Sequence, residues 1–349
     1  MTTCGETCEL VPAAPRKNRS VLAKAKLAMA ASSSTTTTGG HYMFLVALSL
    51  LSFAAYGQLS EQFYAAKCPS LDQIIKAEVD RTLSVDRRMG ASLLRLFFHD
   101  CFVQGCDASV LLDDDAAKSI TSEKTAGPND KSLRGFDVID RIKDQVEAAC
   151  GVPGARVGVV SCADILALVT KQAVIYLAGQ PGWAGWSLLL GRRDSTTANK
   201  DEANTVLPSP DSELTTLIEA FKNKNFTGRE LVALSGAHTI GVAQCGNVDE
   251  TQRQKCIDAN NNNTFPLDDE TPVDFDKGYY DNLLRDKGLL HSDRVLVDSN
   301  DLKLLVLQYA RRKDLFFKDF ANAMEKMSLM SVLTGTSGEI RLNCSRVNY

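Results

Sequence analysis

Two of the four histidines in the sequence lie in runs of residues that could carry acid–base or redox chemistry. His99 lies in the run 95–102 (RLFFHDCF), and His238 lies in the run 234–241 (LSGAHTIG). On a helix, Arg95 and His99 are one turn apart and project from the same face. A neutral histidine can take up a proton and deliver it again, and an always-charged guanidinium can stabilise a negative charge that develops beside it. This pair suits the cleavage of a peroxide, and His238 suits the ligation of an iron.

For an isolated Arg95–His99 pair, the favoured alternative would be a core histidine beside an arginine whose head reaches solvent. The residues that follow change this weighting, because they crowd oxygen donors together. The donors are the side chains of Asp100, Asp107 and Ser109 and the carbonyls of Val103 and Gly105, in a loop that Cys101 and Cys106 can close. Hard oxygen ligands suit Ca²⁺. A solvated acidic turn is the alternative, against which the apolar flanks argue.

Helical periodicity dominates after residue 58 and supplies the elements that must position these groups. The amphipathic or apolar segments are 71–83, 89–101, 136–149, 159–177, 213–223 and a late helix with one face at 317–327. A capping box, Thr227 to Glu230, opens the helix that ends near His238. Strand signals are few and short, as at 188–190. The sequence therefore indicates an all-α domain in which different helices contribute His99 and His238.

The N-terminal 57 residues predict export. Residues 43–55 form an apolar stretch of the length found in signal peptides, with basic residues upstream and small residues at 54–57. The stretch is too short to span a bilayer. We expect residues 1–57 to be an extension plus a signal peptide, with Met43 as an alternative start, and residues 58–349 to form a single domain without a membrane segment.

The composition bounds the size of the fold and the kind of partner. The 349 residues are 44% apolar, which allows one large domain or two lobes around a cleft. The net charge is −4, and residues 58–349 hold 34 basic and 41 acidic side chains without a long basic run. A nucleic acid is therefore not expected as a partner.

The cysteines agree with export. Eight follow the leader, at positions 68, 101, 106, 150, 162, 245, 256 and 344. An even number behind a signal peptide predicts a disulfide framework, although the spacing alone leaves about 105 pairings open. A metal site is the weaker alternative, because no C-x2-C pair faces a second pair or a histidine pair. Sequons at Asn225, Asn262 and Asn343 fit a secreted surface, although Asn343 directly precedes Cys344.

The segment 95–109 (RLFFHDCFVQGCDAS) resembles the distal signature of the secreted plant peroxidases, the horseradish-type class III haem peroxidases. Further matching segments are Phe63-Tyr64, Cys68-Pro69, 160–164 (VSCAD), 191–195 (GRRDS) and the ending 340–343. The resemblance covers nearly all of residues 58–349. It implies the haem-peroxidase fold, in which two helical lobes stapled by disulfides enclose one haem b.

The resemblance also implies an activity. It is the one-electron oxidation of phenolic donors, such as lignin precursors, by H2O2 through ferryl haem intermediates. Roles in wall polymerisation, H2O2 removal and the response to oxidative stress follow. The expected protein is a monomer with H2O2 and small phenols as its only partners. Because the chain ends at Tyr349, soon after the last cysteine, the extracellular space or cell wall is expected rather than the vacuole.

By the same resemblance, His99 is the distal acid–base catalyst, Arg95 is its electrostatic partner and Asn129 keeps the imidazole basic. Asn129 could equally be a turn residue after Gly127-Pro128, and both roles can hold together. His238 is the iron ligand, and Asp293 accepts the other ring N–H of that ligand. Substrate contacts are implied for Pro208 and for Phe98, which also lies near His99 on the helix.

Two Ca²⁺ ions and four disulfides are implied as well. The first ion is held by Asp100, Val103, Gly105, Asp107 and Ser109, with Glu123 joining through water. The second is held by Thr239, Asp268, Thr271, Asp274 (by its carbonyl) and Asp276. The disulfides are Cys68–Cys150, Cys101–Cys106, Cys162–Cys344 and Cys245–Cys256.

The chain departs from the family at two places. Eleven residues lie between Cys150 and Cys162, more than is usual, which indicates a loop insertion. Only ten lie between Cys245 and Cys256, where the family carries a much longer segment. We expect the fold to hold and the effect to fall on donor access and haem retention. This shortening also motivates an alternative: a haem-poor or inactive secreted homologue with a structural or wall-binding role. A calcium-binding module alone would leave His238 and Asp293 unexplained.

Overall fold

The computed structural model of the protein describes residues 59–259 and 263–349. The chain divides into two units, residues 1–49 and residues 50–349, and all described residues belong to the second. The predicted signal segment 43–55 and the sequon at Asn262 lie outside the described residues.

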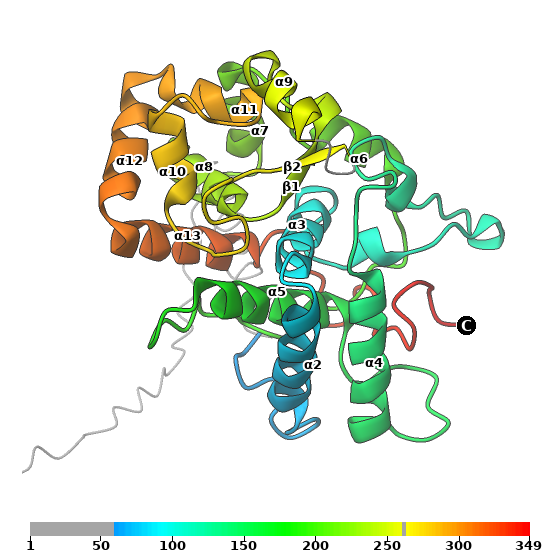
Figure 1. Ribbon diagram of the computed structural model, residues 1–349. Coiled ribbons are helices and arrows are strands. Elements are labelled where there is room, and N and C mark those ends of the chain that lie inside the picture. The colour runs from blue at the N-terminus through cyan, green and yellow to red at the C-terminus, as the bar shows by residue number, and fades with distance from the viewer. Residues whose placement is uncertain (1–58, 260–262) are drawn as a thin grey trace, which may run out of the picture. The chain divides into compact units, whose positions relative to one another are not determined.

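The described part of the chain is mostly helical, which confirms the predicted fold class (Figure 1). Its α-helices are α2 (Leu71–Val85), α3 (Met89–Phe102), α4 (Phe136–Cys150), α5 (Cys162–Ala178), α6 (Lys200–Val206), α7 (Leu214–Asn223), α8 (Gly228–Ser235), α9 (Glu250–Asp258), α10 (Gly278–Leu284), α11 (His291–Arg294), α12 (Asn300–Arg311) and α13 (Lys313–Met327). Strands β1 (Val242–Gln244) and β2 (Thr264–Pro266) pair antiparallel, with Ala243 opposite Phe265.

The helices pack in two groups. In the first, α5 contacts α2, α3 and α4; in the second, α8 contacts α7, α12 and α13, and α10 contacts α12 (Figure 1). Helix α5 is surrounded by its neighbours, and this burial explains why its sequence is apolar almost throughout. The ring of Phe102 on α3 lies 5.2 Å from that of Phe221 on α7, so one hydrophobic core continues from the first group into the second.

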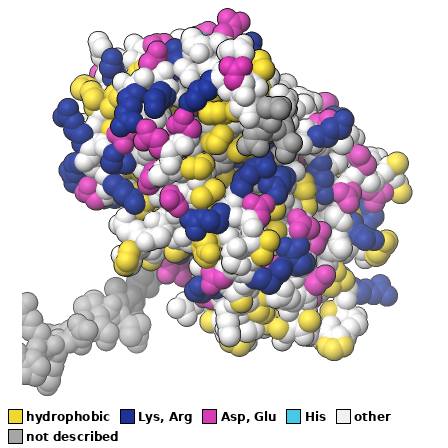
Figure 2. All heavy atoms as spheres, in the orientation of Figure 1, with side chains coloured by type: hydrophobic (Ala, Val, Ile, Leu, Met, Phe, Trp, Pro, Cys, Tyr) yellow, Lys and Arg dark blue, Asp and Glu magenta, His cyan; other side chains and the backbone are white. Residues whose placement is uncertain are grey.

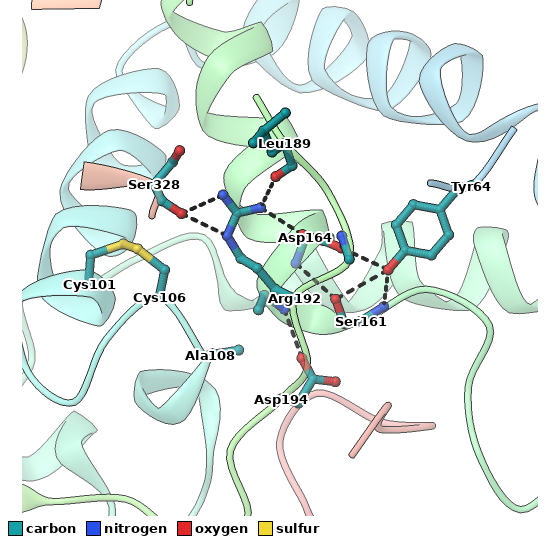
Figure 3. Close-up of polar contacts among 12 residues, drawn as sticks. Tyr64, Cys101, Cys106, Ala108, Ser161, Asp164, Leu189, Arg192, Asp194 and Ser328 are labelled. Carbon is teal, nitrogen blue, oxygen red and sulfur yellow. Dashed lines mark hydrogen bonds and ion pairs between the residues drawn. A yellow bond between two sulfur atoms is a disulfide. The ribbon is translucent and has the colours of Figure 1, made fainter. Parts of the chain in front are cut away.

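A buried ion pair joins segments that are far apart in the sequence (Figure 3). Arg192 Nη1 lies 2.7 Å from Asp164 Oδ1, and neither side chain is accessible to solvent. The other oxygen of Asp164 accepts hydrogen bonds from Tyr64 Oη at 2.8 Å and from the Gly191 backbone N–H at 2.7 Å. Arg192 also donates to the carbonyl of Ser328, just beyond α13. A buried charge needs an opposite charge and hydrogen bonds, because no water solvates it. Here these contacts tie the start of α5 to segments near both ends of the described domain.

The four predicted disulfide pairings are confirmed: Cys68–Cys150, Cys101–Cys106, Cys162–Cys344 and Cys245–Cys256. The predicted capping box is also confirmed, because Thr227 and Glu230 each bond the other's backbone N–H at the start of α8. The strand predicted at 188–190 is wrong. Within the described residues this segment has only an isolated bridge, between Leu190 and Ser60, since no neighbouring strand is there to pair with it.

Candidate functional site

His99 lies in the last turn of α3, on a helix that is buried along most of its length. His99 is 6% exposed, and its Nδ1 lies 2.5 Å from Asn129 Oδ1. Asn129 is itself held by a hydrogen bond from its Nδ2 to the carbonyl of Glu123, at 2.9 Å. The amide orientation makes Oδ1 the acceptor, so Nδ1 of His99 carries the proton. The other ring nitrogen, Nε2, therefore has the lone pair that a base requires.

Arg95 lies one turn before His99 on α3, as the spacing predicted, and backbone and hydroxyl oxygens hold its guanidinium. It donates to the carbonyls of Pro128 at 2.8 Å and Ser132 at 3.1 Å, and to the Ser132 hydroxyl at 3.1 Å. No carboxylate neutralises it among these contacts. Burial lowers the pKa of Arg95 to about 10, so the side chain keeps its positive charge at neutral pH.

Burial and the Arg95 charge together lower the pKa of His99 from 6.5 to about 3. The hydrogen bond to Asn129 raises this pKa but is outweighed. The imidazole is therefore neutral throughout the physiological range and can accept a proton. The guanidinium beside it cannot, because it is already fully protonated. The two residues thus have the complementary states that a base and an electrostatic stabiliser need.

The second histidine lies in the short 3-10 turn Gly236–Thr239, directly after α8. His238 Nδ1 is 2.8 Å from Asp293 Oδ1 on α11, and Asp293 is almost fully buried. Burial lowers the pKa of His238, but the charge and the hydrogen bond of Asp293 outweigh it and raise the pKa above its usual value. An Nδ1–H that donates to a carboxylate leaves Nε2 as the metal-binding nitrogen.

The side chain of His238 is partly accessible to solvent, with 38% of it exposed. The charge of Arg95 also lowers the pKa of His238, as it does that of His99. Charges act strongly only over short distances in a protein. The structure therefore brings the Arg95–His99 pair and His238, which the sequence separates by more than 130 residues, to one region.

One further residue of this site, Tyr279, was not predicted from the sequence. Tyr279, on α10, donates from its hydroxyl to Asp293 Oδ1 at 2.9 Å, the same oxygen that contacts His238. Its ring meets that of His238 edge to face, with 6.1 Å between the centroids. Tyr279 is one of eight tyrosines, and nothing in its local sequence distinguishes it.

The residues predicted for the first Ca²⁺ site are buried close together after α3. Asp100, Asp107 and Glu123 are each at most 4% exposed. Burial and mutual repulsion raise the pKa of Asp100, and burial raises those of Asp107 and Glu123 to about 6 and about 7. Two buried oxygens, Ser109 Oγ and Glu123 Oε2, have no hydrogen-bond partner among the described residues. Carboxylates that are crowded together, with oxygens that lack hydrogen-bond partners, repel one another. A Ca²⁺ ion among them would supply the missing positive charge and bind those oxygens.

Two carbonyl oxygens predicted for this Ca²⁺ site already accept hydrogen bonds. Lys224 Nζ donates to the carbonyl of Val103 at 3.2 Å, so this predicted ligand already has one partner. The carbonyl of Gly105 accepts from the Asp107 N–H at 2.8 Å. Within residues 59–259 and 263–349, no three His, Cys, Asp or Glu side chains are grouped as a ready metal site. The oxygen donors therefore fit a calcium ion as a mixed set of side chains and carbonyls rather than as an acidic triad.

The residues predicted for the second Ca²⁺ site form a connected network beside His238. Thr239 Oγ1 donates to Asp276 Oδ1 at 3.0 Å. Thr271 Oγ1 lies 3.1 Å from Asp276 Oδ2 and 3.0 Å from Asp268 Oδ2, which is fully buried. The side chain of Asp274 lies 2.7 Å from Arg87, and the binding of an ion by the Asp274 carbonyl stays a prediction.

The predicted substrate contacts are placed less specifically. Phe98 is half-buried, and its ring lies edge to face with that of His99, 5.6 Å between centroids. Pro208 is half-buried in the turn after α6. Their contacts with a donor remain predictions. On the face shown in Figure 2, positive and negative side chains are interspersed. Within the part of the chain that the structure describes, no helix is both long and apolar enough to cross a membrane.

Comparison with known proteins places this chain among the peroxidases. Residues 75–312 match the family described as Peroxidase. The chain is 49% identical over 323 residues to peroxidase 70 of Zea mays, covering 88% of this chain and 97% of that protein. It is 46% identical over 322 residues to peroxidase 67 of Arabidopsis thaliana, covering 87% and 98%. It is 46% identical over 318 residues to peroxidase 4 of Vitis vinifera, covering 86% and 95%. The chain belongs to the plant peroxidase family and is a haem peroxidase of the class III type.

Proposed function

We propose that this enzyme is secreted and uses H2O2 to oxidise small phenolic donors, with His99, Arg95 and His238 as its central residues. The observation that carries the assignment is the pair of oriented imidazoles. Each has its Nδ1 bound to a partner, Asn129 or Asp293, so each presents Nε2 as the reactive nitrogen. The alternative, a haem-poor structural homologue, is not favoured, since the relatives over most of the chain are named peroxidases.

The residues around His238 fit a haem b. The ring is partly accessible, and the charge and hydrogen bond of Asp293 raise its pKa despite burial. A bound haem would be held through His238 Nε2, with Asp293 fixing the ring orientation, and it would supply the redox chemistry of peroxide reduction. The predicted substrate contacts, Phe98 and Pro208, would then meet the donor.

The proton transfer belongs to His99. As a neutral base it takes the proton from one peroxide oxygen at Nε2 and delivers it to the other, which leaves as water. Asn129 fixes the imidazole in the orientation and tautomer that this transfer needs. Arg95 donates to the oxygen that gains negative charge while the O–O bond breaks. Its guanidinium is held by Pro128 and Ser132 before the substrate arrives, so little reorganisation is required.

Two calcium ions would brace the two histidines. The first, beside Asp100, Asp107, Ser109 and Glu123, would neutralise buried carboxylates next to His99. Through Glu123, whose carbonyl holds Asn129, it would also steady the partner of His99. The second ion, within the network of Thr239, Asp268, Thr271 and Asp276, would hold the residue that follows His238.

We infer secretion from the leader and from the disulfides. Four disulfides are typical of an oxidising compartment, and the predicted signal segment precedes the described domain. The mature protein would be a single domain, 58–349, without a membrane anchor, acting as a monomer in the extracellular space or cell wall. Asn225 is exposed, as a glycosylated sequon requires.

The test is haem reconstitution followed by stopped-flow mixing with H2O2. The wild-type protein should show a Soret band that shifts rapidly with peroxide, and His99→Ala should keep the band but lose the rapid shift. His291→Ala is the matched control, because that imidazole pairs with Glu213 and should leave the peroxide reaction fast. A protein that binds no haem would contradict the proposal. A panel of coniferyl alcohol, sinapyl alcohol, guaiacol and ascorbate would then define the donor.

A further inference from the structure

One carboxylate oxygen serves two donors beside the proposed haem ligand. Asp293 Oδ1 lies 2.8 Å from His238 Nδ1 and 2.9 Å from the hydroxyl of Tyr279. The three residues come from three places in the chain: the turn after α8, helix α11 and helix α10. Because both contacts end on the same atom, the strength of one depends on the presence of the other.

The Tyr279 hydroxyl is a permanent donor. The side chain is 3% exposed. Its hydroxyl lies 2.9 Å from Asp293 Oδ1. In this contact it can only donate, since an ionised carboxylate only accepts.

Hydrogen bonding to the charged form of an acid stabilises that form and lowers its basicity. The bond from Tyr279 therefore draws electron density from Asp293 Oδ1. Less density is left for the bond from His238 Nδ1–H, which gives the imidazole its anionic character. The rings of Tyr279 and His238 also meet edge to face, with 6.1 Å between their centroids.

We propose that Tyr279 is a positioning residue that limits the negative charge Asp293 passes to His238, and so sets the electron donation of the iron ligand. This inference rests on the proposed role of His238 as the haem ligand. Without the Tyr279 hydroxyl, Asp293 would accept from His238 alone, and the imidazole would become more anionic. An anionic ligand favours ferric over ferrous iron.

The chain offers a matched control in the next residue. Tyr280 is fully buried, and its ring lies 5.0 Å from that of Tyr279. Its hydroxyl donates to the backbone carbonyl of Val232, at 2.9 Å, and not to Asp293. Tyr279→Phe and Tyr280→Phe therefore remove the same atom from neighbouring buried positions. Only the first alters the carboxylate bound to His238.

The experiment compares the two variants with the wild-type protein after haem loading. Tyr279→Phe should raise the iron–histidine stretching frequency in the resonance Raman spectrum of the ferrous form. It should also lower the ferric/ferrous midpoint potential. We expect at least a tenfold change in that equilibrium, which is about 59 mV for a one-electron couple. Tyr280→Phe should leave both quantities near their wild-type values.

Equal shifts in the two variants, or a higher potential in Tyr279→Phe, would overturn the inference while leaving the haem site in place. Failure of haem binding in the wild-type protein would instead overturn the proposed function. The haem-free protein still tests the inference, because the proton resonance of His238 Nδ1–H should move downfield in Tyr279→Phe as its hydrogen bond strengthens. An unchanged resonance there would count against it.

Discussion

The low pKa of His99 predicts an unusually wide pH range for the reaction with peroxide. Burial and the Arg95 charge move this pKa from 6.5 to about 3. At about 1.36 kcal/mol per pH unit, protonation of the buried imidazole is disfavoured by about 5 kcal/mol. The sign follows from the role of the residue. A base with a lowered pKa is active above that pKa and loses activity as the pH falls through it.

The lowered pKa of His99 changes the fraction of neutral imidazole enough to be tested at a single pH. At pH 4, a histidine with a pKa of about 3 is roughly 90% neutral, whereas one with the ordinary value of 6.5 is only about 0.3% neutral. The two cases differ about 300-fold in the rate constant for the reaction with H2O2. We expect the rate constant of the haem-loaded enzyme to be nearly constant from pH 7 to pH 4 and to fall below that.

The assay is a pH-jump in a stopped-flow instrument, in which protein kept at pH 7 is mixed with H2O2 in buffers of pH 3 to 8. Mixing without peroxide shows whether the Soret band survives the jump, which separates acid unfolding from protonation of His99. A half-maximal rate near pH 6 would refute the reasoning. Arg95→Leu removes the second cause of the lowered pKa. It should move the acid limb to higher pH and also reduce the plateau.

Three further predictions concern Asn129, Asp107 and Asp164. Asn129→Val removes the acceptor for His99 Nδ1, so the peroxide rate constant should fall at every pH, as the same stopped-flow assay would measure. Asp107→Asn should stabilise the calcium-free, chelated protein at pH 7 by up to about 3 kcal/mol. Burial raises the pKa of Asp107 to about 6, so at pH 7 its buried negative charge destabilises the folded state. In excess Ca²⁺ the same substitution should destabilise the protein, because it removes a ligand of the ion. Thermal unfolding with and without chelator measures this reversal, and equal effects in both would contradict it. Asp164→Asn leaves buried Arg192 without a counter-charge and should cost about 3–5 kcal/mol in denaturant unfolding, with a smaller loss expected in the double variant with Arg192→Met.

The half of the site around His99 could be predicted from the sequence because its residues lie close together in the chain. Arg95 and His99 share one face of a single helix, and the helical period alone places them together. Asp100 and the loop closed by Cys101 and Cys106 follow within a few residues, so their proximity also depends on short stretches of chain. The apolar residues on both sides of His99 indicated that it would be buried, and this burial lowers its pKa.

The half of the site around His238 depends on contacts between distant parts of the chain. Asp293 lies 55 residues from His238, and its pairing was implied by resemblance rather than by any local pattern. Tyr279 went unnoticed for the same reason. The segment 188–190 was taken for a strand because local composition favours one, but a strand also needs a neighbour, which composition does not reveal. The polar helix α6 was missed because it is short and has only one buried residue, Ala203.

The shortened segment between Cys245 and Cys256 lies apart from the contacts that hold His238. Its two cysteines, with Val248 and Leu289, form a small hydrophobic cluster separate from the main core. The partners of His238 come instead from helices α10 and α11, which pack within the second helical group or against its turns. The N–H of Asp249 bonds the Leu289 carbonyl, so the short loop is still tied to the chain just before α11. The shortened segment therefore leaves the hydrogen bond of His238 to Asp293 intact. Its consequence should fall on the approach of donors rather than on haem retention.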